Sequence, residues 1–320
     1  MKRIAIFAAV IALGLTSTMG LRVRPVLAQN PSVSSTSSSR SSANPVTIPI
    51  SIKVSGERPE PELQTIDLTV SEDGEPQTIL SIRAIGTNSP LTLAVLIQDD
   101  LVPSIGNEIK PLREFIRRLP RGSRVLVGYV RSGSLQVRQK FTTELEKAGK
   151  ALRIPVGVAS AAAYNPYVEV IEAIKRFDSQ PSGRRAILLV SDGLDTSHGI
   201  DSSSTSQSVD LQRAITEAQR RGIAIYSFYA PSVAPRDQIL IGNAQGSLLK
   251  LSDDTGGRAF FQGTGAPVSF DPFIREVSSL LDKQIALTYL STHPAKGFHR
   301  IKVSSVTPGV KVDFPAGYTR

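Results

Sequence analysis

The chain has no cysteine among its 320 residues, and aromatic residues make up only 6% of it. Without cysteine there can be no disulfide framework and no lipid-modified thiol, so a hydrophobic core must supply the stability by itself. A chain of this length is long enough for one large or two medium domains. The sparse aromatic residues do not interleave with basic ones, which argues against a nucleic-acid-binding surface.

Sequence signatures of common catalytic and phosphate-binding sites are missing as well. There is no GxxxxGK loop, no GxGxxG opening a helix and no GxSxG nucleophile elbow. The three histidines are His198, His293 and His299, and none is spaced with another for a zinc site. The sequence therefore predicts no catalytic residue and a protein that is not an enzyme.

The net charge of +9 is concentrated partly at the N-terminus. Four of the 37 basic residues and none of the 28 acidic ones fall within residues 1–28, which leaves 33 basic against 28 acidic residues in the rest. This mild excess is scattered along the chain rather than gathered in a patch. It again disfavours nucleic acid as a partner.

Residues 1–28 have the features of a signal peptide. Lys2 and Arg3 precede the apolar run Ile4–Leu15, and small residues stand near Ala28, where a signal peptidase would cleave. We therefore expect an exported protein, periplasmic or secreted, with no membrane span after signal removal. Retention of this segment as a membrane anchor stays open.

Composition and periodicity divide the rest of the chain into four parts. Residues 29–45 form a Ser-rich linker. An N-terminal β segment over 46–90 and a C-terminal β segment over 286–320 flank a region of alternating strands and helices over 91–285. This order predicts an α/β fold with a doubly wound, mainly parallel sheet flanked by helices, and flanking β segments that can pair into a small β-sandwich.

Local signals place the helices and hairpins. The predicted helices span residues 107–119, 143–152, 166–177, 209–221, 248–254 and 270–284. Asn165 is placed to cap the third of these, with Pro166 at its first position, and Gly222 to end the fourth. Asp73-Gly74 and Ser132-Gly133 each separate two strand-like runs, which predicts antiparallel hairpins.

Two apolar runs of strand length end abruptly in carboxylates: LTLAVLIQDD (Leu91–Asp100) and RRAILLVSDGLDTS (Arg184–Ser197). An apolar run without alternation is typical of a strand buried on both faces. Ligands of open α/β sheets bind at the carboxyl ends of such strands. The sequence therefore predicts an acidic rim on one edge of the sheet.

Most of the chain after the linker resembles a von Willebrand factor type A domain of the exported bacterial type known as VWFA-related. The resemblance rests on both runs above, on RRGIAIYSFYA (residues 220–230) and on LLKLSDDTGGRAFF (residues 248–261). The β segments on either side match those that flank such domains. The order and spacing of these motifs together are specific, and they imply the α/β fold expected above.

The family carries a metal-ion-dependent adhesion site built from Asp-x-Ser-x-Ser, a threonine and the aspartate of Asp-Gly. Mg²⁺ or another divalent cation, bound by oxygens, completes its shell with a carboxylate of the partner. Asp192 matches the third-loop aspartate. With Asp99 as the leading acid neither serine is retained, and with Asp100 only Ser104 is.

The match to the threonine loop fails, because Ala161–Ala163 and Tyr164 stand before the Asn165 helix cap. The resemblance therefore implies a degenerate site whose candidate metal ligands are Asp99, Asp100, Ser104 and Asp192, and no cofactor is certain. These carboxylates would repel one another. They can recruit a cation in a changed geometry or pair with a basic group from the same chain or a partner, and both alternatives stay open.

We expect an exported, non-enzymatic protein-binding module for adhesion or assembly, with weak or no dependence on metal. Its partner would be a protein at the cell surface or in the periplasm. The residues expected to meet it are Asp99, Asp100, Asn165, Asp192 and Asp195. Two alternatives remain: a structural scaffold or assembly factor with a relic metal site, and a metal-dependent hydrolase that uses the carboxylates directly.

Overall fold

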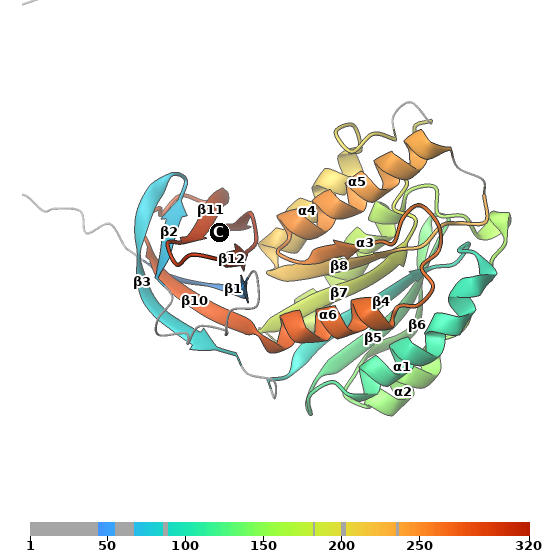
Figure 1. Cartoon of the computed structure of the whole chain (residues 1–320), viewed down its shortest axis with the longest axis horizontal. Helices are drawn as coiled ribbons and strands as arrows, with labels where there is room; N and C mark the ends of the chain where they lie inside the picture. The colour runs from blue at the N-terminus through green and yellow to red at the C-terminus, as the bar shows by residue number, and fades with distance from the viewer. Residues whose placement is uncertain (1–43, 55–66, 86–88, 182, 200–202, 235–236) are drawn as a thin grey trace, which may run out of the picture. The chain divides into compact units, whose positions relative to one another are not determined.

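The computed structural model describes residues 44–54, 67–85, 89–181, 183–199, 203–234 and 237–320. The predicted signal peptide and most of the predicted linker lie outside these ranges. Within them, no helix is both long enough and apolar enough to cross a membrane. The described strands form two sheets (Figure 1).

The first sheet has six strands in the order β6-β5-β4-β7-β8-β9. The strands are β4 (Leu91–Gln98), β5 (Arg124–Arg131), β6 (Ser134–Thr142), β7 (Arg184–Ser191), β8 (Ile223–Tyr229) and β9 (Arg258–Phe260). Neighbouring strands run parallel, except that β5 and β6 form the antiparallel hairpin predicted at Ser132-Gly133. This sheet is mainly parallel, as predicted, and ends in an antiparallel edge strand.

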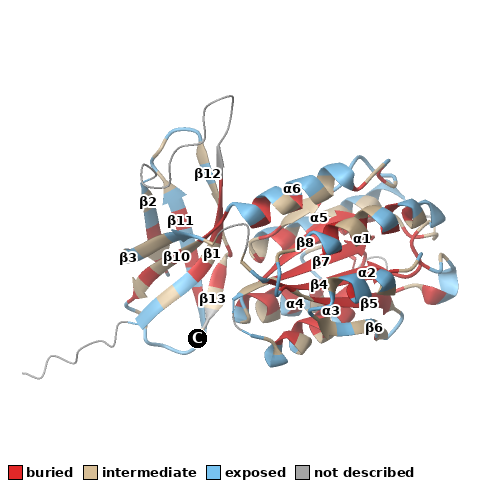
Figure 2. Cartoon of the chain, turned by 90° about the horizontal axis from the view of Figure 1, so that it is seen from below, coloured by how far each residue is buried: buried red, intermediate tan, exposed pale blue. Residues whose placement is uncertain are grey.

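Helices cover both faces of this sheet. They are α1 (Ile109–Arg117), α2 (Leu145–Ala151), α3 (Pro166–Lys175), α4 (Val209–Arg220), α5 (Gln238–Asp254) and α6 (Asp271–Asp282). Side chains of α1, α2 and α6 share one core with the sheet, and those of α3, α4 and α5 share the other. Figure 2 shows the central strands β4 and β7 as buried between the helices. The region is therefore α/β, with a mainly parallel sheet and helices on both faces, which is the part of the predicted fold that the structure shows.

The buried strands show why an unbroken apolar run was needed. All eight residues of β4 are buried. Leu93 and Val95 point into the core with α1, while Ala94 and Leu96 point into the core with α3. Because a strand alternates its side chains between two faces, a strand between two helical layers needs apolar residues at every position.

Most helix ends lie where local signals placed them. The side chain of Asn165 accepts a hydrogen bond from the backbone N–H of Tyr167 at 3.1 Å and caps α3. Gly222 follows α4 with φ of +61°. A 3₁₀ segment, Pro103–Glu108, precedes α1.

One helix prediction was wrong in extent, because α5 begins at Gln238 and not at residue 248. Its first half contains Gly242 and Gly246, which weaken the helical pattern. Packing compensates for this, since Leu240 and Ala244 are buried in the core and Asp237 caps the helix through the N–H of Leu240.

The second sheet has seven strands in the order β12-β1-β10-β3-β2-β11-β13. The strands are β1 (Asn44–Val54), β2 (Leu68–Glu72), β3 (Glu75–Ala84), β10 (Gln284–Ser291), β11 (Phe298–Ser305), β12 (Val310–Asp313) and β13 (Gly317–Thr319). Residue pairings in this sheet are antiparallel throughout. In this sheet β1 pairs with β10 and β12, and β2 pairs with β11.

The predicted small β-sandwich differs from this arrangement, because the described strands form a single curled sheet (Figure 1). A register shift between Thr288 and Tyr289 interrupts the pairing of β10 with β3. Curling lets one sheet enclose its own core, to which Ile50, Leu287 and Val303 contribute. The hairpin between β2 and β3 turns at Asp73 and Gly74, both with positive φ, as predicted.

Candidate functional site

The predicted acidic rim lies where the chain order of the parallel sheet reverses. Strand β4 pairs with β5 on one side and with β7 on the other, so the connections leave β4 and β7 in opposite directions. Asp99 and Asp100 directly follow β4, and Asp192 directly follows β7. All three side chains are buried, with at most 3% exposed. Carboxylates so far from water need partners close by.

Asp99 has a basic partner from the same chain. The guanidinium of Arg153 donates to both carboxylate oxygens, at 2.7 and 2.8 Å, and the N–H of Val156 donates to Oδ1 at 3.0 Å. Arg131 approaches Oδ2 to 3.5 Å. Burial alone would raise the pKa of Asp99, but these hydrogen bonds and charges hold it below its usual value.

Arg153 is itself held in place by Tyr129. Its guanidinium lies over the ring of Tyr129, 3.9 Å from the ring centroid. The hydroxyl of Tyr129 lies 2.6 Å from both the carbonyl oxygen and the backbone N–H of Arg153. Both oxygens of Asp99 are therefore engaged by a positioned internal cation.

Asp100 and Asp192 are connected through a neutral amide. The Nε2 of Gln98 donates to Oδ1 of Asp100 at 2.9 Å. Its Oε1 accepts hydrogen bonds from the hydroxyl of Ser191 at 2.5 Å and from the N–H of Asp192 at 3.1 Å. Burial, and secondly the charge of Asp100, raise the pKa of Asp192 to about 6. This pair of acids therefore carries less negative charge near neutral pH than two free carboxylates would.

The other predicted site residues shape loops. Ser104 is exposed on the 3₁₀ segment. Besides capping α3, Asn165 donates from Nδ2 to Asp210 at 2.9 Å. Asp195 accepts hydrogen bonds from the N–H and hydroxyl of Ser197 and from the hydroxyl of Ser208, which caps α4. The last of these measures 2.6 Å, and it ties the loop after β7 to the start of α4.

The donor set at this edge suits a divalent ion poorly. Among the described residues, Asp99, Asp100 and Asp192 do not bring three ligand atoms within 4.8 Å of one another. Asp99 commits both oxygens to Arg153, and hydroxyl ligands of the Asp-x-Ser-x-Ser kind are replaced by Leu101 and Pro103. An ion at this edge would have Asp100 and Asp192 as its acidic ligands, and Mg²⁺ asks for about six oxygens.

A second feature of this edge is an exposed apolar segment over residues 154–164. Exposed fractions are 59% for Ile154, 48% for Val156, 42% for Val158 and 59% for Tyr164. The segment is fixed to the rim, because the N–H of Gly157 donates to the carbonyl of Asp99 at 2.9 Å. In the same way the N–H of Thr196 donates to the carbonyl of Tyr164 at 2.7 Å.

Sequence reasoning missed Gln98, Arg153 and this apolar segment. Gln98 ends its strand next to the acids, which is a local signal that could have found it. The run IPVGV (residues 154–158) is apolar and belongs to neither a helix nor a strand. An apolar run outside every predicted helix and strand is a sequence signal that could have marked it as a surface segment. Nothing local marks Arg153, because its partner lies 54 residues away.

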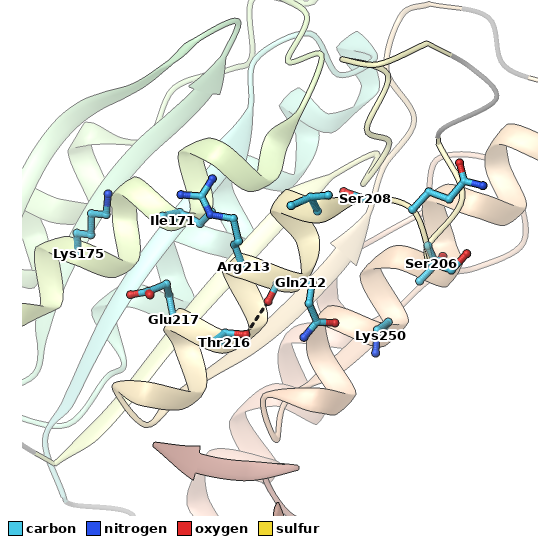
Figure 3. A pocket seen from close by; sticks show the side chains of 12 residues that line it. Ile171, Lys175, Ser206, Ser208, Gln212, Arg213, Thr216, Glu217 and Lys250 are labelled. Carbon is cyan, nitrogen blue, oxygen red and sulfur yellow. Dashed lines mark hydrogen bonds between the residues drawn. The ribbon is translucent and has the colours of Figure 1, made fainter. Parts of the chain in front are cut away.

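Two hollows lie near these elements. One of about 250 Å³ is lined by Asp192, Ser232 and apolar side chains of α5. A larger one of about 610 Å³ lies against α3, α4 and the loop before α4, and Figure 3 shows its polar side chains. Two of its basic side chains are matched within the chain, since Arg213 pairs with Asp210 and Lys250 with Asp254. Lys175 lines the same hollow.

No family model matches the sequence, and no curated protein matches it either. Similar solved structures include an aerotolerance-related membrane protein from Bacteroides fragilis, at 10% identity over 60% of this chain and 99% of that one, with a TM-score of 0.41. BatB from Bacteroides thetaiotaomicron is 12% identical over 60% and 98%, with a TM-score of 0.42. A von Willebrand factor type A protein from Catenulispora acidiphila is 12% identical over 81% and 76%, with a TM-score of 0.41.

At these identities and TM-scores, the matches support no statement about the function of this chain. The mainly parallel sheet with helices on both faces agrees with the α/β fold that the sequence predicts. At the carboxyl edge of the parallel sheet, Arg153 holds Asp99, and Gln98 lies between Asp100 and Asp192.

Proposed function

We propose that this chain is an exported, non-enzymatic protein-binding module. It would engage a protein partner, at the cell surface or in the periplasm, through the carboxyl edge of the parallel sheet and with little or no need for metal. The observation that carries the proposal is the exposed apolar segment 154–164, fixed by hydrogen bonds to the buried Asp99 that Arg153 neutralises.

Exposed apolar side chains next to one another favour a protein partner. A soluble chain rarely leaves several large apolar side chains exposed within one short segment unless they meet another surface. Val156 and Gly157 are held by hydrogen bonds to Asp99, and Tyr164 by one from Thr196. Because the backbone is already ordered, little conformational entropy is lost on binding.

The pairing of Asp99 explains why metal would not be needed. In metal-dependent adhesion the partner's carboxylate completes the coordination shell of a divalent ion. Here Arg153 supplies the positive charge, and breaking such a pair would leave a buried carboxylate uncompensated. Apolar contacts would then supply most of the affinity. The loops that carry them would be held in place by four acids, Asp99, Asp100, Asp192 and Asp195.

The test is photo-crosslinking in cells that naturally make the protein. A photoreactive phenylalanine replaces Tyr164 in the full chain, and a matched probe replaces Leu249 on α5, which is 43% exposed. We expect one protein crosslinked from position 164 and none from 249. The substitution Ile154→Asp should reduce that crosslink at least tenfold, whereas Leu249→Asp should leave it unchanged.

Metal chelation separates the alternatives. EDTA should leave the crosslink from position 164 intact. Loss of the crosslink on chelation, with recovery on adding Mg²⁺, would support metal-dependent adhesion instead. Equal crosslinking from both positions would contradict a docking surface at this edge and would favour a scaffold that uses another face.

A further inference from the structure

A cluster of carboxylates and imidazoles lies in the antiparallel sheet. Glu72 ends β2 and is fully buried, and Asp73 begins the turn to β3. His293 follows β10, far away in the sequence. We propose that Glu72, Asp73 and His293 bind one divalent transition-metal ion of the zinc class.

The three donors already converge. One ligand atom from each residue can be chosen so that all three lie within 4.8 Å of one another. Nδ1 of His293 lies 3.8 Å from Oε1 of Glu72. Two ligands of a tetrahedral ion with bonds of about 2.1 Å lie roughly 3.4 Å apart. A movement of a few tenths of an ångström would bring this one pair of atoms to ligand spacing, and for the carboxylate of Asp73 the bound is the 4.8 Å given above.

The hydrogen bonds around the cluster leave one ligand atom open on Glu72 and one on His293. Oε1 of Glu72 accepts from the hydroxyls of Ser291 and Tyr318, at 3.1 and 3.0 Å. Oε2 of Glu72 is buried and has no hydrogen-bond partner among the described residues, and the same holds for Nδ1 of His293. Burying a carboxylate oxygen without a partner is costly, and a metal ion would remove that cost.

Neighbouring groups orient two of the three ligands. Oε2 of Glu75 lies 3.5 Å from Nε2 of His293, so the proton of the neutral ring is favoured on Nε2 and Nδ1 keeps its lone pair. Asp73 accepts from Nδ1 of His299 and from the N–H of Arg300, each at 2.8 Å. His299 also donates from Nε2 to the carbonyl of Ala295 at 2.8 Å, so both of its nitrogens carry a proton, its ring is an imidazolium, and it is a positioning residue and not a ligand.

The donor set selects the class of ion. One imidazole nitrogen with two carboxylates suits Zn²⁺ and its first-row neighbours, whereas Mg²⁺ and Ca²⁺ prefer oxygen ligands alone. The side chains of His293 and Asp73 are 22% and 37% exposed, so an ion can enter and water can take the fourth position. In a chain without cysteine, this ion would join the turn between β2 and β3 to the connection after β10.

A network without metal is the alternative reading of the same residues. Tyr289 has a buried hydroxyl with no hydrogen-bond partner in the part of the chain that the structure describes, and burial, followed by the nearby charge of Glu72, raises the pKa of that hydroxyl. In such a network the hydroxyl of Tyr289 would donate a hydrogen bond to Oε2 of Glu72, and no ion would be needed. The two readings differ in whether the full chain binds metal and in which histidine that binding depends on.

Calorimetric titration of the metal-stripped full chain with Zn²⁺ tests the proposal. We expect one ion bound per chain and a higher melting temperature when it is present. His293→Ala should weaken binding at least 100-fold and abolish the thermal shift, and Glu75→Gln should weaken binding about tenfold. His198→Ala removes an exposed histidine of the α/β region and serves as the matched control, with no change expected.

Co²⁺ provides a second readout, since its visible absorption reports nitrogen and oxygen ligands. The absorption should appear with the full chain and be absent with His293→Ala. Absence of Zn²⁺ binding and of the Co²⁺ spectrum in the unaltered chain would overturn the proposal. So would binding that survives His293→Ala but is lost with Asp192→Asn, because the ion would then lie at the other sheet.

Discussion

Replacing Arg153 by methionine should destabilise the protein by about 3 kcal/mol. The substitution removes two charge-assisted hydrogen bonds to Asp99, at 2.7 and 2.8 Å, and the contact with the ring of Tyr129. Asp99 is fully buried and would lose its main compensating charge, a change that costs about 3–5 kcal/mol in buried pairs. We take the lower end because the side chain of Arg153 is 31% exposed, so water reaches the pair.

A double-mutant cycle with Asp99→Asn isolates the pair. When Asp99→Asn is already present, no carboxylate is left uncompensated, so Arg153→Met should cost only about 1 kcal/mol, a coupling of roughly 2 kcal/mol. Urea unfolding at pH 7, followed by circular dichroism, measures each variant. A cost below about 0.5 kcal/mol for Arg153→Met, or a coupling near zero, would refute the claim that Arg153 neutralises Asp99.

The pH dependence of the unaltered chain should agree in sign. The pKa of Asp99 is lowered from 3.8 in the folded protein, so its pairing stabilises the fold above that value. This contribution is lost as the pH falls below 3.8 through the folded pKa. The difference in stability between the unaltered chain and Arg153→Met should therefore shrink in acid.

Three further predictions concern other residues. Burial, and secondly the charge of Glu172, raise the pKa of Glu169 from 4.5 to about 7, so the free energy of unfolding should fall as the pH rises from 4.5 to 7. Glu169→Gln should then be more stable than the unaltered chain by about 3 kcal/mol at pH 8 and equal to it near pH 4. Equal stability of the two proteins at both pH values would contradict this. Asn165→Ala removes the cap of α3 and should cost about 1 kcal/mol in urea unfolding, whereas Asn165→Ser should recover most of that. Gly193→Ala should cost at least about 2 kcal/mol, because φ is +71° and a Cβ would lie 2.4 Å from Leu248 and 2.9 Å from the carbonyl of Ala244. Gly199 also has positive φ, but a Cβ there would meet no atom within 4 Å. Comparing the melting temperatures of Gly193→Ala and Gly199→Ala would show whether crowding or φ dominates the cost.

Strands and helix ends could be predicted because their causes are local. The run Leu91–Gln98 is apolar at almost every position, and this is what a strand between two helical layers requires. Asn165 before Pro166 and Gly222 after α4 act within a few residues of themselves. The start of α5 escaped prediction because its glycines weaken the local pattern while Leu240 and Ala244 stabilise it through the core.

The rim could be located but its chemistry could not be read from the sequence. Carboxylates after β4 and β7 were expected, and the structure brings Asp100 and Asp192 close enough for each to affect the other's charge. The partner of Asp99 is Arg153, which one sequence cannot reveal because the two meet only after the loop 152–165 folds back over the sheet. The cluster of Glu72, Asp73 and His293 escaped for the same reason, since its members come from opposite ends of the chain.

The strand order of the antiparallel sheet has a consequence for how the protein folds during its synthesis and export. Among the described strands, β1 has β10 and β12 from the last part of the chain as its neighbours, and β2 pairs with β11. When the chain emerges from the ribosome or from an export channel, these early strands have backbone N–H and C=O groups without a partner strand. They can pair only after the strands from Gln284 onward have emerged. Such edges attract other chains. A chaperone that shields strand edges, or prompt folding of the intervening α/β region, would then decide how much of the newly made protein reaches its native state.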